Sequence, residues 1–279
     1  IRDYKVTGVQ TCALPILLGW FALAGQVAGA LTFYLAGKWV KEHNKMNSLR
    51  LGVAVAALFY LLVLLLGNEA IRYVIPLGII LGTSAGFFWL AFNVVYFEVT
   101  GPEDRDRFNG WSGLLGSASS MIAPWISGLI ISQAGGGQSG YRIVFALSMA
   151  VFVIGVIISF FLKKRKVSGH YSWSYGFKEL RRKGTPWKRV FAGLAAQGVR
   201  EGVFGFIIGV LIFIATKNES KVGSYSLITS AVGLGAFWLI GRFIKPKHRV
   251  GAMLAGVCVM VLAIVPFFWK VNYGTLLVF

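Results

Sequence analysis

The sequence is dominated by apolar runs long enough to cross a membrane. A membrane-crossing helix needs about 20 predominantly apolar residues. Runs of about this length lie at 17–37, 51–66, 73–98, 111–132, 141–162, 190–215, 222–241 and 251–269, and a further run begins near 272. Only 14% of the residues are charged, whereas soluble domains average about 25%. The pattern predicts an all-α polytopic transmembrane helix bundle and excludes a coiled coil, a collagen-like rod and a disordered chain.

The two ends of the sequence differ from the rest. Val6–Ile16 reads VTGVQTCALPI, which resembles the translation of a common sequencing adapter, so we treat residues 1–16 as an artefact in predicting the fold. The last apolar run stops after a few residues, too few for a membrane crossing. We therefore expect the chain to be an internal fragment of a longer protein.

Basic residues alternate between the loops and predict the topology. Loops 38–50, 99–110, 163–189 and 242–250 hold 20 of the 28 Lys and Arg residues, and the loops between them hold 5. Basic residues mark cytoplasmic loops. The pattern predicts a multi-pass protein of the cell membrane with these four basic loops in the cytoplasm.

An internal repeat indicates how the helices are organised. Gly29–Lys41 reads GALTFYLAGKWVK, and Gly233–Lys245 reads GLGAFWLIGRFIK, 204 residues later. Both copies share the order Gly, basic, aromatic, aliphatic, Lys, and both end an apolar run before a basic loop. The chain crosses the membrane six times between them, so the repeat unit is six helices in parallel orientation. Such repeats are typical of transporters built from two six-helix halves.

With these motifs the chain resembles a major facilitator superfamily secondary transporter, from its second helix to the start of its tenth. The resemblance implies two six-helix pseudo-repeats, incomplete here: an N-terminal half at 17–162 without its first helix, a basic cytoplasmic connector at 163–189, and a truncated C-terminal half at 190–279. It also implies transport of a small molecule by alternating access, with no cofactor.

The family's Gly-rich loop motif resembles two places in this sequence. Gly37, Lys38 and Lys41 follow the second family helix, and Gly241, Arg242 and Lys245 follow the eighth. The sequence departs from the family here, because Lys41 and Lys245 occupy the acidic position. We therefore hypothesise that Glu98 pairs with Lys41 or Lys38 as a sign-swapped inner gate. Residues 119–128 partly resemble the fifth-helix motif of antiporters, with Ala123 in place of the Gly before Pro124.

The most chemically distinctive group is Gln197, Arg200 and Glu201. Arg200 lies roughly 15 Å into the run that begins at 190, near the middle of a hydrocarbon core about 30 Å thick. Ionised groups there cost at least about 2.5–3.5 kcal/mol, and they usually mark pathway residues. Neighbouring helical residues diverge, so we expect Arg200 and Glu201 not to pair with each other, and Gln197 to share a face with both. Arg200 would bind an anionic group or a partner acid, and Glu201 would carry a proton; a structural ion pair locking two helices is the alternative.

Other polar and aromatic residues lie inside predicted spans. Trp89 and Asn93 share a helix face, with Tyr96 nearby, and could form a stacking and hydrogen-bonding wall of a cavity. An interfacial Trp belt and a helix–helix hydrogen bond explain them equally well. Gln26 could also line the cavity, although an interhelical hydrogen bond is slightly favoured.

The connector 163–189 mixes aromatic residues with basic ones. It predicts either an amphipathic helix on anionic membrane lipids or a solvated linker. Nucleic-acid binding is disfavoured because the loop lies between two spans.

Enzyme and metal signatures are not found in the sequence, which has no metal-ligand spacing among its three histidines. By analogy with the family that the chain resembles, we expect a monomeric, proton-coupled efflux transporter, an antiporter rather than an enzyme. Its partners are a small-molecule substrate, protons and membrane lipids. A non-transporting receptor or scaffold of the same fold is one alternative, and a membrane-embedded enzyme is another.

Overall fold

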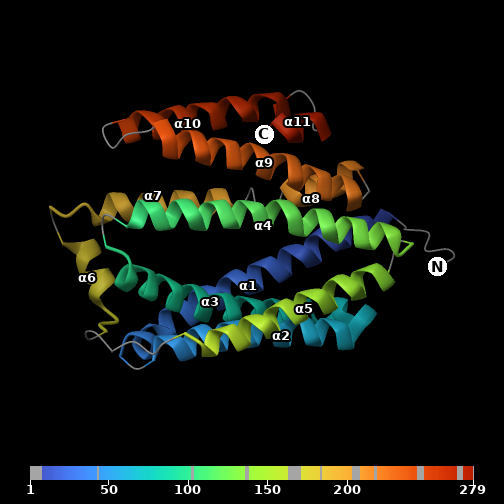
Figure 1. Cartoon of the computed structure of the whole chain (residues 1–279), viewed down its shortest axis with the longest axis horizontal. Coiled ribbons are helices and arrows are strands. Elements are labelled where there is room, and N and C mark those ends of the chain that lie inside the picture. Colours follow the sequence, from blue (N-terminus) through green and yellow to red (C-terminus); the bar gives the residue numbers. More distant parts are fainter. Residues whose placement is uncertain are drawn as a thin grey trace. The chain divides into compact units, whose positions relative to one another are not determined.

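A computed structural model describes residues 8–42, 44–101, 104–135, 138–162, 171–182, 184–202, 208–216, 219–243, 248–268 and 273–278. All regular structure within these ranges is helical, which confirms the predicted all-α fold (Figure 1). The elements are α1 (Gly8–Glu42), α2 (Lys45–Leu66), η1 (Gly67–Tyr73), α3 (Val74–Val99), α4 (Arg105–Gln133), α5 (Gln138–Phe160), α6 (Tyr175–Arg181), α7 (Trp187–Gly202), α8 (Gly209–Thr216), α9 (Glu219–Phe243), α10 (Arg249–Ile264), η4 (Val265–Phe268) and α11 (Tyr273–Val278).

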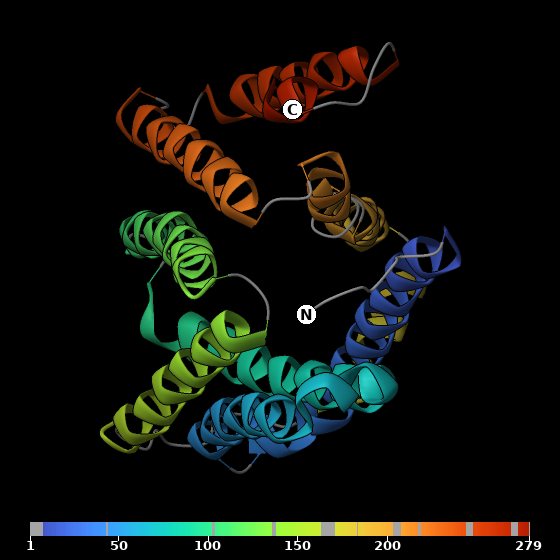
Figure 2. The ribbon, with the colours of Figure 1, turned by 90° about the vertical axis from the view of Figure 1, so that its right-hand side faces the viewer.

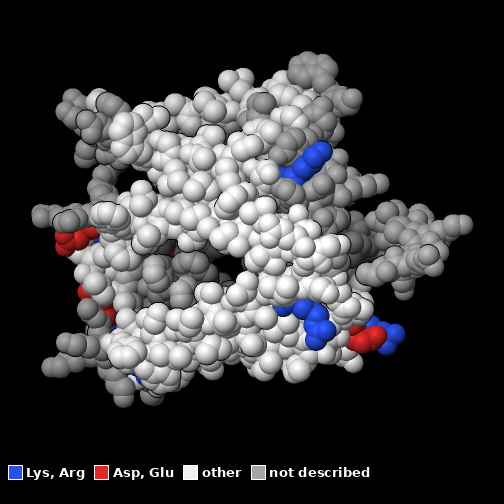
Figure 3. Space-filling view, turned by 45° about the vertical axis from the view of Figure 1, so that its right-hand side comes forward, with Lys and Arg blue, Asp and Glu red and all other residues white. Residues whose placement is uncertain are grey.

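Five helical stretches of the described chain are long and apolar enough to cross a membrane. They are Ile16–Glu42, Lys45–Val99, Phe108–Gln133, Gln138–Phe160 and Lys221–Leu239. Between 6% and 17% of the most apolar part of each is buried, so their apolar side chains face outwards. The face in Figure 3 is accordingly mostly uncharged where residues are described. Outward apolar surface of this extent is expected of a protein that has lipid as its solvent.

Three predicted boundaries differ in detail from the structure. The predicted loop 67–72 is a 3-10 helix, η1, so α2 and α3 follow each other through one unbroken helical stretch. Gly67 stands where α2 ends and η1 begins. Its φ of 51° is a positive value that glycine adopts without steric strain. The predicted span 190–215 is described as two pieces, α7 and α8. Helix α1 begins at Gly8, inside the segment set aside as an artefact.

The chain forms two compact units, one of Ile1–Val99 with Arg142–Glu201 and one of Thr100–Tyr141 with Gly202–Phe279. In the second unit α4 packs against α9. A Cβ added at Gly223 of α9 would lie 3.0 Å from the carbonyl oxygen of Pro124 in α4. The units are groups of closely packed helices, and their boundaries differ from those of the two halves predicted from the repeat.

In the first unit α1 packs against α3 (Figure 2). Glycines of both helices line this contact, which we call the α1–α3 seam. A Cβ at Gly78 of α3 would lie 2.5 Å from the carbonyl oxygen of Phe21, and one at Gly86 would lie 2.8 Å from that of Gly29. A Cβ at Gly82 would collide with the backbone of Gly25. Lipid tails are as apolar as the helices, so no hydrophobic force drives helices together in a membrane. Helices associate instead through close van der Waals packing, which small residues such as glycine allow.

Helix α2 packs on another face of α3 and is held there by two hydroxyl groups. Ser84 Oγ donates a hydrogen bond to the Gly52 carbonyl oxygen at 2.8 Å, and Ser48 Oγ donates one to that of Phe87 at 3.1 Å. Asn44 caps the start of α2 by accepting from the backbone N–H groups of the second and third helical residues. The first two turns of α2 are thereby held against the middle of α3.

Candidate functional site

The ionic cluster on α7 is formed by Gln197, Arg200 and Glu201. Gln197 Nε2 donates a hydrogen bond to Glu201 Oε1 at 3.0 Å, as the four-residue spacing predicts. The Arg200 guanidinium also binds the Glu201 carboxylate, so the expectation that these two do not pair is wrong. The arginine side chain is long enough to bend back to its neighbour although the two Cβ atoms diverge. The side chains of Arg200 and Glu201 are 39% and 61% exposed, so the cluster is accessible on the surface of α7.

The expected inner gate on Glu98 has a different partner. Lys45 Nζ lies 2.5 Å from both carboxylate oxygens of Glu98, and only 4% of the lysine side chain is exposed. The hypothesis that Lys41 or Lys38 holds Glu98 is therefore wrong. Helix α1 turns the buried Val40 towards α3, which leaves both of these lysines on the exposed side. The sequence interpretation missed Lys45, although its place just after an Asn cap signals the first turn of α2.

On α3 the structure adds an aromatic ladder to the predicted wall. Phe92 stacks on Tyr96 with the ring centroids 6.5 Å apart, and it also stacks on Phe88 at 6.1 Å. Trp89 meets Phe92 edge-on at 5.4 Å and is exposed, as is Asn93. Sequence analysis named Trp89, Asn93 and Tyr96 but missed the phenylalanines, which their four-residue spacing could have signalled.

Gln26 lies exposed on α1, and no described residue shares a hydrogen bond with it. The interhelical hydrogen bond favoured from the sequence is therefore not seen in the described part of the chain. Of the second motif copy, Gly241 and Arg242 fall in α9 with their side chains outside what is described, and Lys245 lies outside the described residues.

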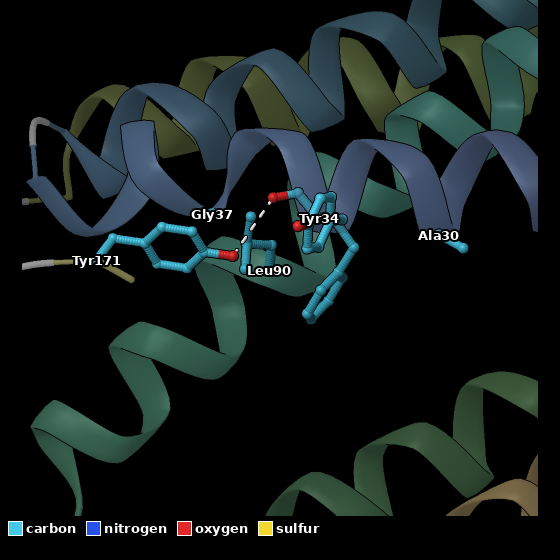
Figure 4. Close-up of a pocket in the computed structure, with 6 residues that line it drawn as sticks. Ala30, Tyr34, Gly37, Leu90 and Tyr171 are labelled. Atoms are coloured by element: carbon cyan, nitrogen blue, oxygen red, sulfur yellow. Dashed lines mark hydrogen bonds between the residues drawn. The ribbon is translucent and has the colours of Figure 1, made fainter. Parts of the chain in front are cut away.

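Tyr171 rests on Gly37, the glycine of the first loop motif (Figure 4). A Cβ at Gly37 would lie 2.6 Å from the Tyr171 ring. The Tyr171 N–H donates to Glu42 Oε1 at 3.0 Å, and its hydroxyl donates to the Tyr34 carbonyl oxygen at 3.4 Å. Trp173 packs edge-on against both tyrosine rings. We call these contacts the aromatic clasp: Tyr171 and Trp173 of the connector on Tyr34, Gly37 and Glu42 of α1.

The clasp closes one side of a pocket of about 480 Å³. Its lining is mostly apolar and is drawn in Figure 4: Ala30, Phe33, Tyr34, Gly37, Leu90 and Tyr171. Burial, and to a smaller extent the neighbouring Tyr34, raises the pKa of the Tyr171 hydroxyl above its ordinary 10.0. The hydroxyl therefore stays neutral at physiological pH. Within the described residues, no group of three His, Cys, Asp or Glu side chains could hold a metal ion.

Comparison with known proteins identifies the family. The model of the Major Facilitator Superfamily matches residues 9–279. The chain belongs to this family. Family membership agrees with the predicted transmembrane helix bundle.

Two curated relatives carry no described activity. The "Uncharacterized protein YqgE" of Bacillus subtilis (strain 168) is 40% identical over 249 residues, which is 89% of this chain and 57% of the relative. The "Uncharacterized protein in sodM 3'region" of Geobacillus stearothermophilus is 46% identical over 128 residues, 46% of this chain and 59% of that protein. The chain thus spans less than two thirds of either relative. No solved structure matches it.

Proposed function

We propose that the protein is a secondary transporter that exports a small amphipathic molecule by alternating access in exchange for protons. It would act as a monomer in the cell membrane, with the basic loops in the cytoplasm. Membership of a family of transporters supports the general activity. Direction and proton coupling rest on the family resemblance and on the chemistry of α7.

The cluster of Gln197, Arg200 and Glu201 is the observation that carries the proposal. It places a guanidinium and a carboxylate in a predicted membrane span, where an ionised group costs at least about 2.5–3.5 kcal/mol unless it meets water or a partner. The two partly neutralise each other, which lowers that cost. A carboxylate bound in this way can accept a proton and release the arginine for an anionic group of the substrate. Glu201 is the proposed proton carrier, Arg200 the proposed substrate ligand, and Gln197 the positioning residue for Glu201.

The remaining pathway is proposed from side chains of α3 and α1, of which Trp89, Asn93 and Gln26 are exposed and Tyr96 is half-buried. Trp89, Asn93 and Tyr96 offer stacking surfaces and an amide, and Gln26 offers a second amide. An amphipathic substrate needs such a combination of aromatic faces and few polar contacts. We propose that Lys45 and Glu98 hold α2 and α3 together at the cytoplasmic end, in place of the family's acidic loop residue.

The test is proton and substrate flux in proteoliposomes of the full-length protein. Vesicles containing the dye pyranine report protons, and sulforhodamine B, an amphipathic dye that carries sulfonate groups, serves as the transported probe. We expect Arg200→Ala and Glu201→Gln to abolish exchange at normal abundance in the membrane. The matched control is Arg72→Ala with Glu69→Gln, because these residues form an exposed ion pair at 2.7 Å on η1. Wild-type flux in both cluster variants would refute the assignment.

One departure from the family favours a second candidate, a receptor or scaffold that does not transport. Lys41 stands where the family's loop motif is acidic. If the wild-type protein binds sulforhodamine B but transports neither the dye nor protons, that result would support this second candidate over the first.

A further inference from the structure

The short helix α6 presents an outward face that combines aromatic and basic side chains. Phe177 is 63% exposed, and Lys178 and Arg181 beside it are exposed too. Phe177 and Arg181 are four residues apart and Lys178 and Arg181 three, so the three side chains lie on one face of the helix. Neither cation forms an ion pair with a described carboxylate.

The other face of α6 is turned towards the protein. Glu179 and Leu180 are half-buried, and Glu179 is bound by Arg182 at 3.5 Å. The only acidic side chain of α6 is thereby withdrawn from the exposed face and partly neutralised. The outward face is therefore purely cationic and aromatic.

The position of α6 in the chain fixes it near a membrane boundary. It follows the aromatic clasp, which ties Tyr171 to α1 near the motif that ends the first apolar run. It precedes α7, whose first residues repeat the pattern of α6 with exposed Trp187, Lys188 and Arg189. A linker fixed at both ends between two predicted spans cannot move far from the head-group layer.

We propose that the outward face of α6 and the first turn of α7 bind the surface of anionic phospholipids. Lysine and arginine would meet the lipid phosphates, and Phe177 and Trp187 would enter the boundary between head groups and acyl chains. Both contributions are typical of helices that lie on anionic membranes. The proposal goes beyond transport and depends only on placing the basic connector at the membrane.

The experiment uses the full-length protein with its native cysteines, Cys258 among them, replaced by serine and with a single environment-sensitive NBD label. Phe177→Cys places the label on the outward face, and Gly176→Cys places it off that face, where a Cβ meets no described atom within 4 Å. Both proteins are reconstituted in nanodiscs of phosphatidylcholine with or without phosphatidylglycerol. We expect phosphatidylglycerol to shift the emission of label 177 to shorter wavelength more than that of label 176. Raising the salt from 0.1 to 1 M should reverse the shift, because the Debye length falls from about 10 to about 3 Å.

Charge variants test the cause of the shift. Neutralising a cation near the surface weakens binding about fivefold, so Lys178→Gln, Arg181→Gln and Lys188→Gln together should abolish the response of label 177. The matched control neutralises three bases of loops predicted outside, Arg72, Arg142 and Lys221, and should leave it unchanged. Arg181→Lys, which keeps the charge, should respond like the parent.

Three outcomes would overturn the proposal. Equal responses at 176 and 177 would show that the face has no orientation on lipid. Equal emission with and without phosphatidylglycerol would indicate a solvated linker. A shift produced by a 20-nucleotide RNA in phosphatidylcholine discs, and not by phosphatidylglycerol, would assign the face to nucleic acid. All these readouts are independent of dye and proton flux, so failure here leaves the proposed transport untouched.

Discussion

Alanine substitutions along the α1–α3 seam should destabilise the protein in proportion to how closely the two backbones approach. A Cβ at Gly25 would lie 3.3 Å from the carbonyl oxygen of Gly78, and one at Gly78 would lie 2.5 Å from that of Phe21. Ordinary contact begins at 3.4 Å. Gly25→Ala thus asks the helices to separate by about a tenth of an ångström, whereas Gly78→Ala asks for nearly 1 Å.

Two opposing contributions set the size of the effect. Alanine favours a helix over glycine by about 0.8–1 kcal/mol, and overpacking of a close interface costs about 1–3 kcal/mol. For Gly25→Ala the required shift is small, so the two contributions nearly cancel. For Gly78→Ala the obstacle is a backbone carbonyl that cannot rotate away, and the strain should approach the upper value. We expect a net loss of about 2 kcal/mol, or about a 30-fold fall in the folded-to-unfolded ratio.

The measurement is unfolding of the full-length protein in mixed micelles with rising SDS, followed by tryptophan fluorescence. Gly113→Ala in α4 is the control, because no described atom lies within 4 Å of its added Cβ and only the gain in helix propensity remains. The expected order of stability is Gly113→Ala, then Gly25→Ala, then Gly78→Ala. If Gly78→Ala unfolds together with Gly113→Ala, the seam is not as close as described and the reasoning fails.

Three further predictions concern the ion pair of Glu98 and the aromatic clasp. Glu98→Gln removes the carboxylate from the buried Lys45 ammonium and should cost about 3 kcal/mol in the same unfolding assay; the exchanged pair Lys45→Glu with Glu98→Lys should recover most of it, and no recovery would mean that the pair is incidental. Gly37→Ala places a Cβ 2.6 Å from the Tyr171 ring and should release the clasp, seen as faster trypsin cleavage of the connector, whereas an unchanged rate would count against the contact. Tyr171→Phe keeps the ring contact, so its connector should be cleaved at the wild-type rate. Because burial raises the pKa of the Tyr171 hydroxyl above its ordinary 10.0, the hydroxyl stays neutral from pH 6 to 9. The rate of wild-type cleavage, corrected for trypsin activity, should therefore be constant over this range, and a rise within it would contradict the raised pKa.

Helices could be predicted from the sequence because lipid leaves the backbone little choice. A span of apolar residues must satisfy its own N–H and C=O groups, and a helix does so within one segment. The runs 17–37 and 111–132 therefore reappear within α1 and α4. The predicted loop at 67–72 was less constrained, since polar residues such as Asn68 and Glu69 suit a loop and a 3-10 turn equally well.

Side-chain partners could not be predicted, because they depend on the rotation of each helix about its axis. The predicted spans alone place Lys38 and Lys41 in the loop 38–50, on the same side of the membrane as the end of the span that holds Glu98. In the structure Val40 is the inward residue, with 1% of its surface exposed, and Glu98 forms its ion pair with Lys45 of α2. The pairing of Arg200 with Glu201 was missed for a different reason, since a rule about Cβ directions says little about a side chain with four rotatable bonds.

The two copies of the predicted repeat are similar in sequence but differ in the packing around one matching glycine. Gly29 and Gly233 correspond at the offset of 204, yet a Cβ at Gly29 would lie 3.2 Å from the Gly82 carbonyl oxygen, and one at Gly233 meets no described atom within 4 Å. In the first copy the glycine is required by the helix packed on it. A glycine at the matching place in the second copy is therefore no evidence of close approach by itself, because the steric requirement at Gly29 comes from the backbone of α3 packed against it.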